Sequence, residues 1–137
     1  MAQKKSRPDK VSTAVTLLWI VIAVGVISSI FNFSSLLEIY NASGLGLGGL
    51  IFTLYFSLLF LVFLIWKIGQ GKNWARITYL VLFILGVPFT IYGYLTPTIE
   101  VSAFLIILRI AVMIVQIVAL VFLFQKPSSD WFKSMKK

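Results

Sequence analysis

Four long apolar runs divide the chain, at residues 11–33, 46–66, 77–95 and 101–124. Each run is close to the roughly 20 residues with which an α-helix crosses a hydrocarbon core about 30 Å thick. A soluble amphipathic helix would carry one apolar stripe and a polar opposite face, whereas these runs are apolar on nearly every side. The pattern therefore predicts four transmembrane segments.

Composition indicates that these runs lie in a membrane and not in a water-soluble core, and the membrane in turn requires them to be helices. The 137 residues are 60% hydrophobic and 12% charged, against roughly 45–50% and about 25% in soluble domains. So small a body has too much surface to hide this apolar excess from water. A lone strand would leave its backbone groups unpaired in lipid, so the runs must be helices despite their many β-branched residues. We expect an all-α integral membrane protein.

The distribution of Lys and Arg predicts the orientation. Residues 1–10, 67–76 and 125–137 contain eleven of the 12 Lys and Arg residues, while 34–45 and 96–100 contain none and include Glu38 and Glu100. Because basic loops stay in the cytoplasm, both termini should be cytoplasmic, N-in/C-in. The short connections predict an up-down four-helix bundle between two basic tails, 1–10 and 125–137.

Several kinds of chemistry are excluded. The chain has no Cys and no His, so thiolate nucleophiles, imidazole bases and Cys/His metal sites cannot occur. No acid, base or nucleophile pair lies at matching depth in the spans, and we expect neither an enzyme nor a cofactor. The net charge of +8 lies in short segments beside apolar runs, which favours anionic lipid headgroups over nucleic acid as partners.

Arg109 is the one ionisable side chain inside a predicted span. Ser102 and Gln116 stand seven residues before and after it, two helical turns with about 20° of drift, so the three should form a polar seam on one face. A charge at that depth costs about 2.5–3.5 kcal/mol. Arg109 either reaches the outer headgroups or ties helices together, for example through Glu38, or it lines a polar path or a partner site.

The first run carries a second polar face, with Gly25, Ser28, Ser29 and Asn32 at helical spacing. Small residues let helices approach closely, and Ser or Asn can bond across the contact. This favours helix packing over ligand binding. We expect Ser28 and Asn32 to lie near the seam of Arg109.

The third run combines Tyr79, Gly86 and Gly93, each seven residues apart, with Pro88 between the glycines. Pro88 removes one helical hydrogen bond, which predicts a kink. Such breaks occur in transporters, but Gly and Pro are also common in ordinary membrane helices.

Aromatic and basic residues mark the predicted cytoplasmic boundary. Lys72, Trp74 and Arg76 precede the third run, and Trp131 follows the fourth. Trp rings prefer headgroup depth, and Lys and Arg prefer the phosphates. We expect these four residues to anchor the protein at the membrane interface.

The carboxyl-terminal tail should form a short interfacial turn. Pro127 ends the fourth helix, and Ser128 or Ser129 is placed to cap a following turn. Trp131 and Phe132 would then dip into the headgroups while the lysines face phosphate.

The stretches GKNWAR at residues 71–76 and SDWF at residues 129–132 resemble a family of small, uncharacterised, four-helix bacterial inner-membrane proteins. The resemblance implies a multi-pass protein of the bacterial inner membrane. Small multidrug exporters have a similar layout, but the intramembrane Glu of their first helix has no counterpart in residues 11–33. The sequence thus favours a non-enzymatic membrane subunit that packs with itself, as a homo-oligomer, or with a larger membrane partner. The alternative is an oligomeric small-molecule or ion transporter with Arg109 lining the path.

Overall fold

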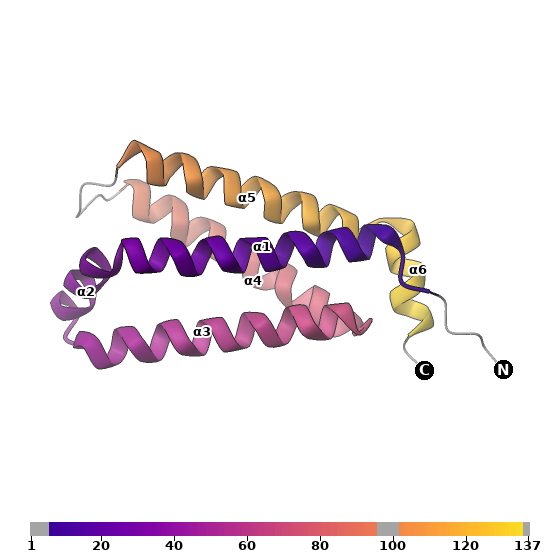
Figure 1. Cartoon of the computed structure of the whole chain (residues 1–137), viewed down its shortest axis with the longest axis horizontal. Helices are drawn as coiled ribbons and strands as arrows, with labels where there is room; N and C mark the ends of the chain where they lie inside the picture. The colour runs from indigo at the N-terminus through magenta and orange to yellow at the C-terminus, as the bar shows by residue number, and fades with distance from the viewer. Residues whose placement is uncertain (1–5, 96–101, 136–137) are drawn as a thin grey trace.

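A computed structural model describes residues 6–95 and 102–135 (Figure 1). The described residues form six helices and no strand. The helices are α1 (Asp9–Phe31), α2 (Phe33–Ala42), α3 (Gly46–Gly69), α4 (Asn73–Leu95), α5 (Ala103–Phe124) and α6 (Lys126–Ser134).

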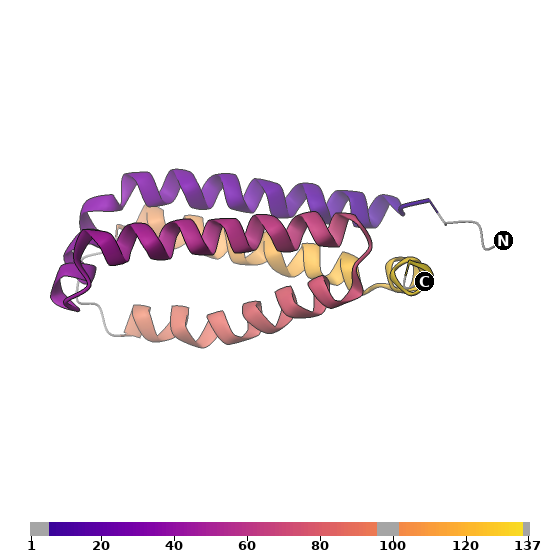
Figure 2. The same cartoon turned by 90° about the horizontal axis from the view of Figure 1, so that it is seen from below.

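Within the described residues, α1, α3, α4 and α5 are each long and apolar enough to cross a membrane. They run up and down beside one another (Figures 1 and 2). α6 and the start of α1 lie at one end, which we call the basic end, and α2 lies at the other, the α2 end. The all-α membrane bundle predicted from the hydrophobic pattern is confirmed.

α2 occupies a stretch that the sequence analysis treated as part of a loop, residues 34–45. One face of α2 carries large side chains at helical spacing, namely Phe33, Leu36, Leu37 and Tyr40. The last three are half-buried, so this face packs on the bundle. Gly44 and Gly46 adopt φ values of 82° and 60°, which lets the chain turn sharply from α2 into α3.

α6 corrects the expectation for the carboxyl-terminal tail. Its N-cap is Gln125, with no side-chain capping bond, so neither Ser128 nor Ser129 caps it. Trp131 is 4% exposed and Phe132 is fully buried. Both rings belong to the same cluster as apolar side chains of the spans. α6 lies across the basic end (Figure 1) and presents its apolar face to the bundle, so these rings pack inward against the spans.

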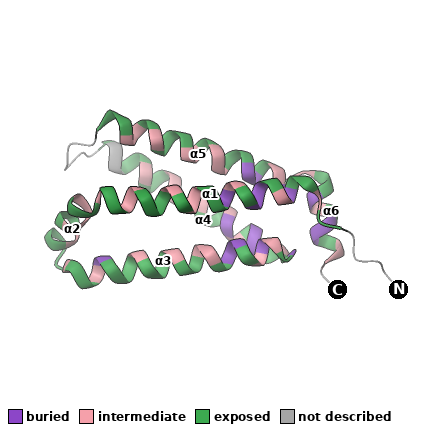
Figure 3. Cartoon of the chain, viewed as in Figure 1, coloured by how far each residue is buried: buried purple, intermediate pink, exposed green. Residues whose placement is uncertain are grey.

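One cluster of buried residues forms the described core, and all of it lies toward the basic end (Figure 3). Its members are Val11, Ala14, Val15, Leu18, Leu64, Ile65, Ile68, Ala75, Tyr79, Ala119, Leu120, Leu123, Trp131 and Phe132. In the half toward α2, Leu50 alone among the described residues is buried. We call these two regions the closed half and the open half.

Candidate functional site

The end of α5 is held by side chains from two other helices. The last four carbonyls of a helix lack the usual partners further along it, and the chain is extended at Gln125. Each carbonyl nevertheless accepts a hydrogen bond. The donors are Gln125 N to Val121 O at 3.1 Å, Ser128 Oγ to Phe122 O at 2.5 Å, Arg76 Nη1 to Leu123 O at 2.7 Å and Ser129 Oγ to Phe124 O at 3.2 Å.

Arg76 is the central residue of this arrangement and is only 6% exposed. Its guanidinium carbon lies 4.7 Å from the centre of the Phe124 ring and 4.4 Å from that of Phe132, and its Nε donates to Asn73 Oδ1 at 2.6 Å. A cation is favoured at the negative end of a helix and over aromatic faces. Arg76 was expected to lie near lipid phosphate, but in the structure its guanidinium is enclosed within the protein and joins α4 to α5 and α6.

The other predicted anchors of the third span point outward. Trp74 is 47% exposed and its ring centre lies 6.0 Å from that of Phe63, while Lys72 is exposed. Both lie beside the short turn between α3 and α4 at the basic end. Their role at the membrane interface stays a prediction.

The structure does not bring the five residues of the predicted polar seam together. Ser102 is the N-cap of α5 and accepts a hydrogen bond from the amide of Leu105 at 3.4 Å. Asn32 donates to the carbonyl of Ser28 on its own helix at 2.7 Å. Gln116 turns into the bundle, whereas Arg109 is exposed and has no polar partner among the described residues.

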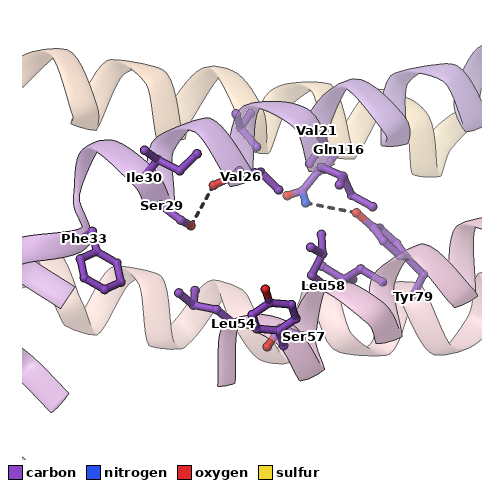
Figure 4. A pocket seen from close by; sticks show the side chains of 15 residues that line it. Val21, Val26, Ser29, Ile30, Phe33, Leu54, Ser57, Leu58, Tyr79 and Gln116 are labelled. Carbon is purple, nitrogen blue, oxygen red and sulfur yellow. Dashed lines mark hydrogen bonds between the residues drawn. The ribbon is translucent and has the colours of Figure 1, made fainter. Parts of the chain in front are cut away.

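A pocket of about 570 Å³ lies in the open half, between α1 and α3 (Figure 4). Val21, Ser29 and Leu58 contribute to its walls, and Tyr79 and Gln116 reach it from α4 and α5. Gln116 Nε2 donates to Tyr79 Oη at 3.1 Å. The pocket lies next to the closed half, and the end of the pocket at Tyr79 borders the buried core.

Chemically, the pocket offers hydrogen bonds and no charge. None of its 15 lining residues, all within the described part of the chain, is Asp, Glu, Lys or Arg. Ser29 Oγ donates to the carbonyl of Gly25 at 2.9 Å. Tyr55 and Ser57 also line the pocket but are exposed, whereas Tyr79 is 4% exposed, so the Tyr79 and Gln116 pair is the most deeply buried polar group. No group of three or more metal-binding side chains occurs among the described residues.

Tyr79, Gln116 and the shared face of Gly25 and Ser29 stood out in three separate apolar runs of the sequence, but the pattern did not predict the pocket. The hydrogen bond between Tyr79 and Gln116 joins residues 37 positions apart. The sequence shows a polar residue in each of these two apolar runs. It does not show that these two faces of the helices contact each other.

Fold and pocket together define a multi-pass, all-α membrane protein with an apolar cavity in one half of its bundle. No family model, no curated protein and no solved structure matches the chain. The resemblance carried by residues 71–76 and 129–132 therefore stays a prediction.

Proposed function

We propose that the protein is a non-enzymatic membrane subunit that packs against a larger membrane partner through α4 and α5 in the open half. The observation that carries this proposal is Arg109. It is the seventh residue of α5 (Ala103–Phe124), so its backbone lies roughly 9 Å inside the helix. It is exposed and has no polar partner among the described residues. A charge in an apolar span needs compensation, which a partner's carboxylate would provide.

A face of α4 in the open half supports the same proposal. Thr90 Oγ1 donates to the carbonyl of Gly86 at 3.0 Å, so this hydroxyl is satisfied within its own helix. A Cβ added at Gly86 would meet nothing within 4 Å. Small residues four apart allow another helix to approach closely, and no described part of this chain uses the position. α4 curves away from the other helices (Figure 2).

The chemistry of Arg109 favours a different protein over a second copy. The four carboxylates of the sequence, Asp9, Glu38, Glu100 and Asp130, all lie outside its apolar runs. A second copy therefore offers no carboxylate at the depth of Arg109, since Asp9 is the first residue of α1 and lies at the basic end. The alternative is an oligomeric small-molecule or ion transporter with Arg109 lining the path, and the pocket described above does not support it, since Arg109 is not among the residues that line that pocket.

Affinity purification in mild detergent tests the proposal. Arg109→Leu should stay folded but lose at least about tenfold of the co-purifying membrane protein, since one charge-paired contact of about 1.4 kcal/mol is a factor of ten. Arg109→Glu should bind less than Arg109→Leu through repulsion, and Arg109→Lys should retain binding. Lys72→Leu, an exposed cation at the basic end, is the matched control. Full partner recovery with Arg109→Leu, or recovery of differently tagged copies of this chain alone, would count against the proposal.

We also propose that the basic end faces the cytoplasm of a bacterial inner membrane. All described Lys and Arg residues except Arg109 lie toward this end, as the positive-inside rule requires. Because the chain has no Cys, single cysteines report the orientation directly. In intact cells, an impermeant thiol reagent should label Glu38→Cys and spare Asn73→Cys. The reverse pattern would invert the topology.

A further inference from the structure

Tyr79 lies at the boundary between the two halves of the bundle. Its side chain is 4% exposed and belongs to the buried cluster of the closed half, while the residue also lines the pocket of the open half (Figure 4). Gln116 Nε2 donates to Tyr79 Oη. Among the described residues, the phenol proton of Tyr79 and Oε1 of Gln116 have no further partner. The deepest polar group of the pocket is therefore only partly satisfied.

Turning the Gln116 amide over does not remove this demand. Tyr79 would then donate to Gln116 Oε1, and the amide N–H groups would be left without an acceptor. Either arrangement presents an unmet hydrogen-bond donor to the pocket. Lipid acyl chains cannot accept a hydrogen bond, and an unpaired buried donor is unfavourable. A group that accepts from this pair would thus be bound preferentially over a bare hydrocarbon chain.

The rest of the pocket sets the character of such a group's carrier. Its apolar lining includes Val21, Ile22, Leu54, Leu58, Leu61 and Val112. A volume of about 570 Å³ falls within the roughly 300–1,000 Å³ typical of small-molecule sites. Without a charged side chain among the lining residues, an ion would lose its hydration and gain no counter-charge. The walls belong to membrane-spanning helices, so the occupant enters from the lipid phase.

We propose that this pocket binds a neutral, largely apolar molecule with a single hydrogen-bonding head, a hydroxyl or a ketone carbonyl, whose head lies against Tyr79 and Gln116. The proposal is independent of the partner site, because neither Arg109 nor Gly86 lines the pocket. The same chemistry has two sources, a free lipophile in the bilayer or the hydroxyl of a neutral lipid such as diacylglycerol.

Photolabelling of the purified full chain in phosphatidylcholine nanodiscs tests this proposal. The probes are long-chain molecules that carry a diazirine near the head and differ in the head group alone: a primary alcohol, a methyl ketone, a plain alkane and a primary ammonium. We expect the alcohol and the ketone to label α1 and α3 around Val21 and Leu58 at least fivefold more than the alkane or the ammonium. Equal labelling by alcohol and alkane would overturn the proposal.

Two conservative variants separate hydrogen bonding from packing. Tyr79→Phe keeps the buried ring, and Gln116→Leu keeps a side chain of similar length, so both should stay folded. Because each variant leaves the other polar side chain in place, each alone should reduce alcohol labelling in part, and the two combined should reduce it to the level of the alkane, about fivefold. Unchanged alcohol labelling in both variants would overturn the assignment of the head group.

Arg109→Leu is the control that separates this site from the partner site, and it should leave labelling unchanged even if it abolishes partner binding. Competition by diacylglycerol then identifies the source. Displacement of the alcohol probe assigns the site to a lipid hydroxyl, and retention of the probe assigns it to a free lipophile.

Discussion

The closed and open halves are built from the same four apolar helices, yet only one of them is packed. The buried cluster draws on α1, α3, α4, α5 and α6 and lies toward the basic end, while Leu50 alone among the described residues is buried in the open half. In lipid, an apolar side chain gains little by exchanging a lipid contact for a protein contact, unless packing or hydrogen bonding improves. Hydrophobicity therefore places the helices in the membrane without closing the bundle.

Specific packing and hydrogen-bond contacts account for the difference in burial between the two halves. In the closed half, α6 inserts Trp131 and Phe132 into the helix ends, and Arg76 bonds to the end of α5. In the open half, Gly25 and Gly86 would each accept a Cβ with nothing within 4 Å, so the positions suited to close helix contact are unused. The closed half is therefore packed by contacts within the chain, whereas the open half leaves its small residues without a packing partner among the described residues.

Replacing Arg76 of α4 and Arg109 of α5, one at a time, by Met should give the largest difference in stability between the two halves. Arg76→Met removes a charged donor and leaves the Leu123 carbonyl unpaired, which should lower the free energy of unfolding by about 3 kcal/mol. Arg109→Met, at an exposed position, should change it by less than about 0.5 kcal/mol. Denaturant titration in mixed micelles, followed by circular dichroism, measures both. Equal losses would mean that the two halves contribute alike to stability.

A matched pair of leucines on α3 sharpens the comparison. Leu64 is fully buried in the closed half and Leu54 lines the pocket. Leu64→Ala should cost about 1–2 kcal/mol, less than in a soluble core, because the unfolded helices stay in lipid and only packing is lost. Leu54→Ala enlarges an existing cavity and should cost less than about 0.5 kcal/mol. The same titration distinguishes the two variants. A larger loss of unfolding free energy at Leu54 would show that the open half is packed in the micelle.

The smallest effect is expected at Trp74, which lies toward the basic end but is 47% exposed. Trp74→Ala should change the free energy of unfolding by less than about 0.5 kcal/mol while weakening the anchoring of α4 at headgroup depth. Quenching of a label placed at Asn73→Cys by headgroup-attached quenchers reports the depth. Loss of folded protein in this variant would place the ring inside the bundle.

The four spans were predictable because hydropathy over about 20 residues depends on composition alone. α2 and α6 were not, since a helix of ten or nine residues depends on the surface that it covers. Arg76 was expected to point toward lipid phosphate, but its guanidinium points into the bundle, where α6 supplies the Phe132 ring. Gln116 could be recognised as polar in an apolar run, but its pairing with Tyr79 requires knowing how two helices are rotated.

The way α5 ends has a consequence for the order of biosynthesis. Two of its last four carbonyls are bonded by Ser128 and Ser129, which leave the ribosome after the whole of α5. Arg76, which bonds the carbonyl of Leu123, is the one side-chain partner of the α5 end that is translated before α5 itself. The final turn of the last span is thus completed after all four spans have been made. A deletion or fusion that disturbs Lys126–Ser134 would therefore act on maturation, although it removes no part of a membrane-crossing segment.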